Sequence, residues 1–526
     1  MSQSLGSLAA FVFAFMYVYV FNPLSENDVP WTQFSTKTAY RHCSLKPYKD
    51  PLYIRPVQSL ASCNLVHVNA LFRHGTRSPT QKDMVKSKNL FERLLSNPNI
   101  KLPKRFRDQP VPFENQTSKG LLPRGFEEHH LLGQLFRARM DRYMKVNISN
   151  VQFYASSIQR AIDSSRSFYH GFSGMPPLSP KYASVGCGSD VEPNDCPSDV
   201  VTERYKFIQE ADKLLRFFTY CKRYVEEIES NKSSVMEYLK FREGPEVRRV
   251  VNNVRSRHSL PAAEFSENDI FLMYAVCSYE VAAETNPFKD HSPWCDFLRP
   301  NEAPVYEYMS DLKHYWRKSY GYELNYVQSC PLVGEMLRQI RNAAHLYKIS
   351  QKSNQESAHE VPQATFWFGH AETLLPVVAA LGLFNDSVDG SKSLSFTADD
   401  FIRWQDKRRM NPPSPMMFRA GHIAPFSGNL ALQLYYLSIG VDDPWSGFFV
   451  EPLVNGQTVA WPLGSPFRVP TKKFPGATFA PLGTVLSRLG SCMPDRFDED
   501  EVCSLPGKST TETHGGTTVA TESSEE

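Results

Sequence analysis

Residues 71–80 read Leu-Phe-Arg-His-Gly-Thr-Arg-Ser-Pro-Thr and place a histidine between two arginines. Guanidinium groups bind phosphate oxygens through paired hydrogen bonds, and a neutral imidazole can attack phosphorus. A lone Arg-His-Gly triplet is more often a surface loop, with Arg73 and Arg77 as solvated charges and His74 as a loop histidine. The longer segment favours a phosphate site, because a strand ends there and a helix begins. It therefore predicts chemistry on a phosphate ester.

The elements around this segment are expected to be a strand, a sharp turn and a capped helix. Residues 64–72 are apolar and β-branched without a helical period, which is typical of a strand. Gly75 permits the turn, Ser78 is expected to be the N-cap, Pro79 the first helical residue and Gln81 the capping-box partner. The helix is predicted to continue to about residue 90, with its first backbone N–H groups completing an anion cradle.

A second strand end is predicted near Arg160. Residues 151–155 alternate apolar and polar side chains, and a helix is expected over 161–168, ending at Gly171. Arg160 lies near the start of that helix, from where its side chain can reach over the end of the sheet. Taken alone, it is more often a solvated helix arginine.

A third strand end is predicted at His370 and Glu372. The apolar strand 364–368 is followed by Gly-His-Ala-Glu-Thr and then by an apolar helix over 374–383. If the chain stays extended, His370 and Glu372 share one face. The alternatives are a strand-end histidine capped by its neighbour, or part of a metal site that lacks a nearby third ligand. Ligands of open α/β sheets bind beyond the carboxyl ends of strands, where these three pieces converge.

These motifs resemble the histidine acid phosphatase branch of the phosphoglycerate-mutase-like superfamily. The matching residues are Arg-His-Gly-Thr-Arg-Ser-Pro at 73–79, Arg160 and His-Ala-Glu at 370–372. The tripeptide His-Ala-Glu is similar to that of the multiple inositol polyphosphate phosphatases, as are Ser-Pro-Trp-Cys at 292–295 and Tyr-Trp-Arg-Lys-Ser-Tyr-Gly-Tyr at 315–322. The resemblance covers roughly residues 43–503. It implies a sandwich-like α/β fold whose mixed, mostly parallel sheet is flanked by helices, with an inserted mainly α-helical domain.

Charge and protonation give each motif residue an expected role. His74 is the predicted nucleophile, forming a phosphohistidine without metal or other cofactor, and Arg73, Arg77, Arg160 and His370 are predicted to bind the phosphate. Clustered arginines oppose protonation of His74, keeping it neutral below its reference pKa of about 6.5. Glu372 is the predicted proton donor to the leaving alkoxide.

The resemblance implies inositol polyphosphates as substrates, namely the hexakisphosphate and pentakisphosphate, together with 2,3-bisphosphoglycerate. A polyanionic substrate needs further basic groups, and one basic stretch falls in the predicted helical insertion. A solvated helix face is favoured over substrate binding for this stretch by roughly three to one. Its members are Lys240, Arg242, Arg248, Arg249, Arg255 and Arg257.

Three functions remain in competition at this point. The first is a secreted inositol polyphosphate phosphatase. The second is a broad-specificity acid phosphatase, or a mutase that returns phosphate to its substrate. The third is a catalytically silent protein that binds phosphate ligands. The net charge of +2, from 58 basic and 56 acidic residues, gives no sign of a nucleic-acid binder.

The N-terminus and the cysteines indicate the secretory route. The apolar run 8–21 is short for a membrane span and is expected to be a signal peptide within residues 1–25, with an uncleaved membrane anchor as the alternative. The ten cysteines predict disulfides, of which a Cys492–Cys503 bond is the simplest guess. Four sequons predict glycosylation at Asn115, Asn147, Asn231 and Asn385. The final compartment, secreted or endomembrane lumen, and the oligomeric state stay open.

The local sequence pattern along the chain predicts its domains. Residues 30–185 and 331–504 alternate strand-like and helix-like segments and should form the α/β core. Residues 186–330 are mainly helical in pattern and should form the insertion. Residues 429–436 read as another strand, and Asn455-Gly456 predicts a hairpin turn between 448–453 and 458–461. The composition of 505–526 predicts a disordered tail.

Overall fold

The computed structural model describes residues 34–40, 63–178, 205–206, 209–284, 292–353, 362–385, 396–409, 418–437, 445–459, 461–462 and 479–506. The N-terminal run 8–21, Cys43, Cys187, Cys196 and the tail beyond residue 506 lie outside these ranges, so the predictions made for them remain predictions. In the described ranges, no helix is both long and apolar enough to cross a membrane.

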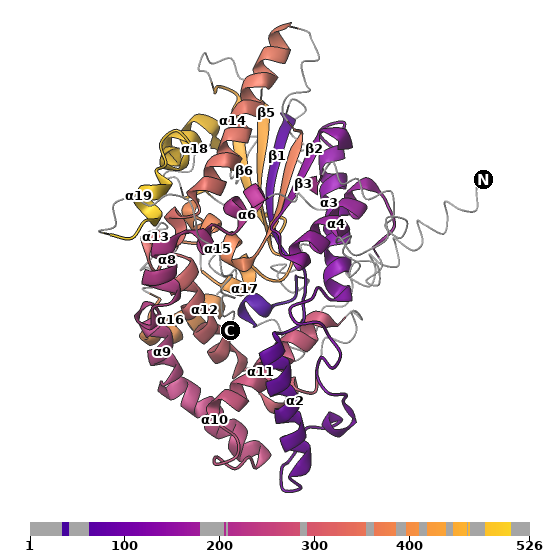
Figure 1. Ribbon diagram of the computed structural model, residues 1–526, viewed down its shortest axis with the longest axis vertical. Helices are drawn as coiled ribbons and strands as arrows, with labels where there is room; N and C mark the ends of the chain where they lie inside the picture. Colours follow the sequence, from indigo (N-terminus) through magenta and orange to yellow (C-terminus); the bar gives the residue numbers. More distant parts are fainter. Residues whose placement is uncertain are drawn as a thin grey trace, which may run out of the picture.

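A mixed sheet occupies the upper half of the molecule (Figure 1). Its strands are β1 (Cys63–Arg73), β2 (Val151–Ala155), β3 (Tyr205–Lys206), β4 (Ala364–Gly369), β5 (Asn429–Leu437), β6 (Phe448–Val454), β7 (Gln457–Thr458) and β8 (Ala480–Pro481). Their order is β3-β2-β4-β1-β5-β6-β7, with β8 beside β6. The first four strands pair in parallel, whereas β5 is antiparallel to both β1 and β6. Since β6 therefore runs with β1, the predicted mixed and mostly parallel sheet is confirmed.

Helices cover both faces of this sheet and form the lower half of the molecule. They are α2 (Gln81–Ser96), α3 (Pro123–Asp141), α4 (Gln159–Ser173), α6 (Gln209–Leu215), α7 (Phe217–Tyr220), α8 (Lys222–Tyr224), α9 (Met236–Arg242), α10 (Pro245–His258), α11 (Glu267–Ala283), α12 (Ala303–Lys318), α13 (Glu323–Val327), α14 (Cys330–Ser353), α15 (Ala371–Ala380), α16 (Phe401–Arg409), α17 (Ala420–Ile423), α18 (Leu482–Arg488) and α19 (Glu499–Cys503). Short turns used below are η1 (Ser35–Lys37), η5 (Val225–Glu229) and η10 (Gly490–Cys492).

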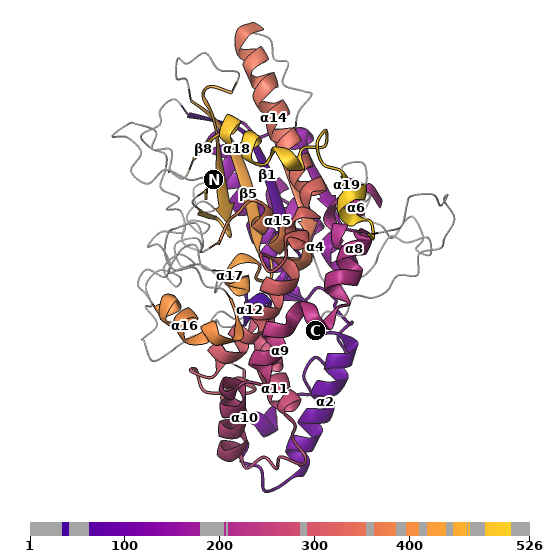
Figure 2. The same cartoon turned by 90° about the vertical axis from the view of Figure 1, so that its left-hand side faces the viewer.

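The helices below the sheet come from two parts of the chain. In both views, α10 and α11 lie there together with α2 (Figures 1 and 2). The described part of 186–330 is helical except for β3, which pairs with β2. The predicted boundaries of the inserted domain at residues 186 and 330 stay a prediction.

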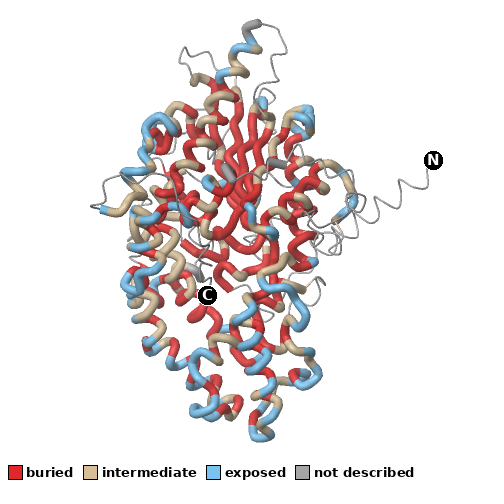
Figure 3. The backbone as a smooth tube through the Cα atoms, in the orientation of Figure 1, coloured by how far each residue is buried: buried red, intermediate tan, exposed pale blue. Residues whose placement is uncertain are grey.

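Alternating side chains on the central strands build two apolar layers. Phe72 and Phe368 face α3 and α4, where Phe168 lies 4.8 Å and 5.4 Å from them between ring centroids. Leu71 and Trp367 point to the other face and join the core formed with α14 and α15. Figure 3 shows the strands as an almost continuously buried centre. Burial on both faces explains why these strands have few polar residues before their ends.

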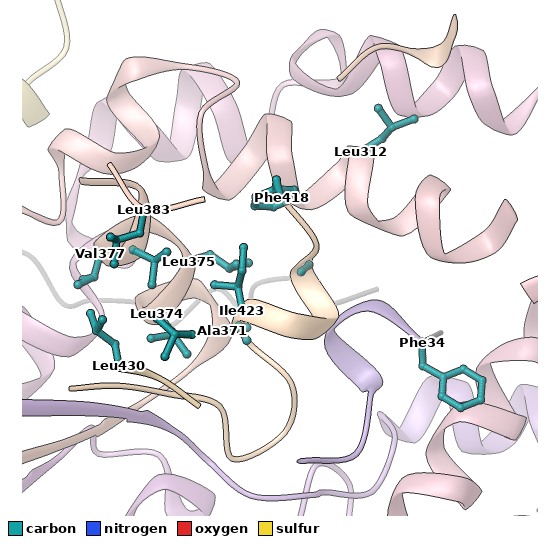
Figure 4. Close-up of a cluster of buried hydrophobic side chains, with 14 of the residues drawn as sticks. Phe34, Leu312, Ala371, Leu374, Leu375, Val377, Leu383, Phe418, Ile423 and Leu430 are labelled. Carbon is teal, nitrogen blue, oxygen red and sulfur yellow. The ribbon is translucent and has the colours of Figure 1, made fainter. Parts of the chain in front are cut away.

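Apolar packing also fixes α15, the helix that follows β4. Leu374, Leu375 and Val377 lie in the cluster shown in Figure 4, together with Leu430 of β5 and Ile423 of α17. Each of these side chains is at most 1 % exposed. The N-terminus of α15 is therefore held rigidly against the end of the sheet.

The predicted start of one helix and the predicted end of another are wrong. The helix after the first strand begins at Gln81 with Thr80 as its N-cap, because the Thr80 hydroxyl accepts the Asp83 N–H at 3.1 Å. Ser78 instead donates its hydroxyl to the Thr117 carbonyl. The Gln81 N–H is bound to Ser118 and the Asp83 N–H to Thr80, so neither of these two groups is open to an anion.

The second helix continues past the predicted end at Gly171. It ends at Ser173 and is capped by Gly174, whose φ of 75° suits glycine. Gly171 is needed for a different reason, because a Cβ there would lie 1.9 Å from the His130 carbonyl oxygen of α3. The predicted hairpin is confirmed, with φ of 51° at Asn455 and 77° at Gly456.

The predicted Cys492–Cys503 disulfide is wrong. The described cysteines form the bonds Cys221–Cys503, Cys277–Cys295 and Cys330–Cys492. Cys492 in η10 lies against the start of α14, whereas Cys503 ends α19 beside α8. Closeness in sequence was a poor guide, because two of the bonds join residues 282 and 162 positions apart.

Candidate active site

The first strand delivers Arg73 and His74 to the end of the sheet. Arg73 is the last residue of β1, and its N–H donates to the Gly428 carbonyl at 2.8 Å. The His74 N–H donates to Gly369 at the end of β4, at 3.0 Å. These two backbone hydrogen bonds continue the pairing of β1 with β5 and with β4 to the end of the sheet. The side chain of His74 is thereby fixed in a buried position, with 1 % exposure.

One hydrogen bond defines the tautomer of His74. Its Nδ1 lies 2.9 Å from the carbonyl oxygen of Gly75. Since a carbonyl oxygen only accepts, Nδ1 carries the proton and Nε2 keeps the lone pair. Burial lowers the pKa of His74 well below its usual value, and the charges of Arg160, Arg73, His370 and Arg77 lower it further. The imidazole is therefore neutral in mildly acidic solution, with Nε2 available as a nucleophile.

The predicted phosphate ligands come together around this histidine. The four charges that act on His74 belong to Arg73, Arg77, Arg160 and His370, from three different strand ends. The rings of His74 and His370 are 5.5 Å apart, edge to face. The structure thus brings together the five residues predicted for nucleophilic attack and phosphate binding.

Arg73 and Arg77 are oriented by neutral groups. Arg73 donates to the carbonyls of Thr36 and Ala424 and lies 4.5 Å above the ring of Phe426. Arg77 donates to the Ser78 carbonyl at 2.8 Å and to the Tyr279 hydroxyl at 3.4 Å. These carbonyl, hydroxyl and ring partners are uncharged, and none of them neutralises the guanidinium that it orients.

His370 is oriented by Ser156 and Arg160. Its Nδ1 is 3.5 Å from Nη2 of Arg160, and its Nε2 is 2.9 Å from the Ser156 hydroxyl. Arginine can only donate, so Nδ1 accepts and the proton of neutral His370 is on Nε2. The shared face of His370 and Glu372 depended on an extended chain, and this condition is not met, because α15 begins at Ala371 with His370 as its N-cap. The helix predicted over 374–383 is therefore wrong at both ends, since it covers Ala371–Ala380. His370 and Glu372 are thus presented by a helix start.

Glu128 of α3 supports the His74 loop and was missed in the sequence. Its carboxylate accepts the Thr76 N–H at 3.1 Å, the Thr76 hydroxyl and, at 2.7 Å, the Ser427 hydroxyl. Burial raises its pKa, although Arg124 and the hydrogen bonds oppose this effect. The Glu-His-His run at 128–130 was the available signal, but its burial only becomes visible in the structure. Because it holds both Thr76 and Ser427, Glu128 ties the loop to the segment before β5.

Close backbone contact reinforces the loop. A Cβ on Gly75 would lie 2.6 Å from the carbonyl oxygen of Gly125, so only glycine fits. On the next turn of α3, His129 donates from Nε2 to the Arg73 carbonyl at 3.1 Å. Burial lowers the pKa of His129 to about 3, which keeps it neutral.

Glu372 forms an ion pair with Lys318 at the end of α12. Each side chain is 14 % exposed, so the pair is largely shielded from water. His314, one turn earlier on α12, contacts the Thr36 hydroxyl through Nε2 at 3.2 Å. Thr36 in turn accepts from Arg73. Lys318 was not predicted as a site residue, although the segment 315–322 carried part of the family resemblance.

The predicted basic stretch lies elsewhere. Lys240 pairs with Glu237, Arg242 donates to Asn268, and Arg248 and Arg249 are exposed on α10. Figure 1 shows α10 at the end of the molecule remote from the sheet. None of these residues is among the charges that act on His74. Arg255 is bound to the Phe265 carbonyl and Arg257 to Glu302, so none of these contacts is with a predicted phosphate ligand.

The remaining predicted positions lie on the surface. Asn115, Asn147 and Asn231 are exposed and Asn385 is partly exposed, so glycosylation there stays a prediction. Within the described ranges, no group of three or more His, Cys, Asp or Glu side chains is arranged to hold a metal ion.

Comparison with known proteins gives a consistent result. Residues 64–455 match the model of the histidine phosphatase superfamily (branch 2). Multiple inositol polyphosphate phosphatase 1 of Gallus gallus is 29% identical over 409 residues, 77% of this chain and 80% of that protein. The Homo sapiens protein of the same name is 27% identical, over 83% of this chain and 84% of that protein. A structure of Bifidobacterium longum multiple inositol polyphosphate phosphatase with inositol hexasulfate superposes with a TM-score of 0.58 at 15% identity, covering 88% of this chain and 98% of that one.

Proposed function

Since the chain belongs to the histidine phosphatase superfamily (branch 2) and is a phosphatase, we propose that it hydrolyses inositol polyphosphates through a phosphohistidine at His74. The hexakisphosphate and pentakisphosphate are the expected main substrates, with 2,3-bisphosphoglycerate as a further one. The observation that carries the proposal is the His74 side chain, whose Nδ1 is committed to Gly75 and whose Nε2 lies among the charges of Arg73, Arg77, Arg160 and His370.

The reaction has two steps on this geometry. In the first, Nε2 of His74 forms a bond to phosphorus while the bond to the ester oxygen breaks, and Glu372 gives its proton to that oxygen. Arg73, Arg77, Arg160 and His370 hold the three equatorial oxygens and their growing charge. In the second step, water attacks phosphorus, Glu372 takes its proton, and the P–N bond breaks. The enzyme returns to its starting protonation.

Two observations support the substrate class and the compartment. Curated relatives named multiple inositol polyphosphate phosphatase match most of the chain, and His-Ala-Glu at 370–372 is similar to the motif of that subgroup. Three disulfides in the described residues suit an oxidising compartment. We therefore place the enzyme in the secretory pathway, either secreted or in an endomembrane lumen.

Phosphate release from inositol hexakisphosphate, compared with 4-nitrophenyl phosphate and 2,3-bisphosphoglycerate, tests the proposal. The wild type should prefer the inositol ester, and His74→Ala should lose at least about a thousandfold in rate on all three. Brief incubation with radiolabelled substrate should trap an acid-labile, base-stable phosphoenzyme that His74→Ala lacks. Preference for the aryl ester would instead identify a broad-specificity acid phosphatase. Binding without turnover would identify a silent phosphate-binding protein.

A further inference from the structure

The ion pair between Lys318 and Glu372 conflicts with the role of Glu372 as a proton donor. A carboxyl group must carry a proton in order to give one. An ammonium group in contact with it favours the ionised form, and the more so where water is scarce. With both side chains only 14 % exposed, solvent screens this pair weakly. The pair must therefore separate before the leaving oxygen can be protonated.

The surroundings of the pair favour the arrival of an anion. From α12, His314 lies near Lys318 and Arg317 is its chain neighbour. From α8, Tyr224 lies near Glu372, and its hydroxyl donates to Glu229 of η5 at 3.2 Å. Burial lowers the pKa of His314, and the charges of Lys318, Lys37, Lys313 and Arg73 lower it further. Arg73 belongs both to this set and to the charges that act on His74, so the cations extend from the Lys318–Glu372 pair to the predicted phosphate site.

We infer that Lys318 couples recognition of a second phosphate group to protonation of Glu372. When a polyphosphate ester binds, the phosphate next to the reacting one takes the Lys318 ammonium away from Glu372. Glu372 then loses its counter-ion beside a new dianion, and it takes a proton from solvent. Lys318 stays an ammonium throughout, and the proton gained by Glu372 is the one later given to the ester oxygen. The inference rests on the proposed function and extends it to substrate discrimination.

The reacting phosphate itself does not need Lys318. Its oxygens already face Arg73, Arg77, Arg160 and His370, the charges that act on His74. Glu372 must lie beside the ester oxygen in order to protonate it, and Lys318 contacts Glu372 directly. The next phosphate on an inositol ring is attached to the neighbouring carbon, and in the inferred complex it lies against the ammonium that contacts Glu372. An ester with a single phosphate has no group there and leaves the ion pair closed.

Proton uptake on ligand binding tests this coupling without turnover. Inositol hexasulfate is the probe, because its sulfates do not titrate near neutrality. Calorimetry at about pH 6, in buffers of different ionisation enthalpy, counts the protons bound, and inorganic sulfate corrects for protonation of the histidines around the first site. The wild type should take up more protons with the hexasulfate than with sulfate. Glu372→Gln and Lys318→Met should both lose this excess, whereas Lys86→Met, which removes an exposed lysine of α2, should keep it.

Kinetics on two esters give the second test. Lys318→Met should lower kcat/KM for inositol hexakisphosphate by about 10- to 100-fold, the usual cost of a charge-assisted contact. For 2-glycerophosphate it should not fall, because this ester has no second phosphate for Lys318 to bind. Lys318→Arg keeps the charge and should retain most activity on the hexakisphosphate.

Several results would overturn the inference. Excess proton uptake that persists in Glu372→Gln would assign it to another group, such as His314. Equal losses of Lys318→Met on both esters would make Lys318 a purely structural residue. These failures are distinct from failure of the proposed function, in which the wild type would not hydrolyse inositol hexakisphosphate at all.

Discussion

The two sides of the site hold their carboxylates in different ways. On the sheet side, which comprises Arg73, His74, Arg77 and the groups that orient them, Glu128 is buried and accepts hydrogen bonds from Thr76 and Ser427. On the α12 side, Glu372 is partly exposed and bound to the flexible ammonium of Lys318. Several backbone and hydroxyl donors, with Arg124 3.7 Å away on the same helix, fix Glu128 in place, whereas the single lysine that contacts Glu372 can exchange partners. We therefore expect Glu128 to position the His74 loop and Glu372 to transfer a proton.

The largest test of this comparison is Glu372→Gln. The amide has the same shape but cannot donate a proton to the leaving oxygen, so the rate on inositol hexakisphosphate should fall by about 10²- to 10⁴-fold. The rate on 4-nitrophenyl phosphate should fall much less, because its leaving group needs little protonation. Steady-state kinetics on the two esters measure the ratio. Equal losses on both would show that Glu372 supports the structure and gives no proton.

On the sheet side, Arg160→Gln tests the charge around the nucleophile. The loss of one oxyanion partner should reduce kcat by about 10²- to 10³-fold on every ester. Burial is the main cause of the low pKa of His74, and the charge of Arg160 is the next. Without this charge the pKa rises, so His74 becomes protonated at a higher pH and activity on the acid side is lost earlier.

The pH profile of kcat/KM measures this shift, and it should move toward higher pH in Arg160→Gln. Arg166→Gln is the matched control on the same helix, because Arg166 is not among the charges that act on His74. A profile that stays in place in Arg160→Gln would mean that another group controls the acid side.

Glu128→Ala tests whether Glu128, on the sheet side, serves only to hold the His74 loop in position. Removing the acceptor of Thr76 and Ser427 allows the loop to move, and a displacement near 1 Å costs about 10²-fold in rate. The loss should be the same for aryl and inositol esters, unlike that of Glu372→Gln. Breaking the buried contact with Arg124 should also cost about 3–5 kcal/mol in the free energy of unfolding, measured with urea.

Glu127→Ala is the neighbouring control for this variant. Glu127 pairs with Arg124 at the surface, where its side chain is 43% exposed. Its loss should change the free energy of unfolding by less than about 1 kcal/mol and leave the rates unchanged. A substrate-dependent loss in Glu128→Ala would contradict the division between the two sides.

The two sides also differ in how well the sequence predicts them. Arg73, His74 and Arg77 form one contiguous segment at a strand end, and Arg160 and His370 follow two further strands of the same sheet. Parallel strands bring their carboxyl ends together, so convergence of these residues follows from the secondary structure. The fold class was predictable for the same reason, from the alternation of strands and helices.

The supporting residues were not predictable in this way. Ser427 lies 299 positions from Glu128 and 353 from His74, and their contact depends on how α3 packs beneath the sheet. Lys318 reaches Glu372 from a different helix, 54 positions away. The disulfides follow the same logic, since Cys330–Cys492 reflects tertiary packing and no local pattern marks it.

The smallest effect is expected from substitution of the exposed arginines of α10. Arg248 and Arg249 are exposed on α10, remote from the sheet in both views (Figures 1 and 2). Salt screens exposed charges beyond about 8 Å at physiological ionic strength. Arg248→Ala combined with Arg249→Ala should therefore change kcat/KM for inositol hexakisphosphate by less than about twofold at that ionic strength, against the tenfold or larger loss expected for Lys318→Met. A loss as large as that of Lys318→Met would mean that α10 contacts the substrate. Substrate recognition would then involve α10 in addition to the sheet side and the α12 side.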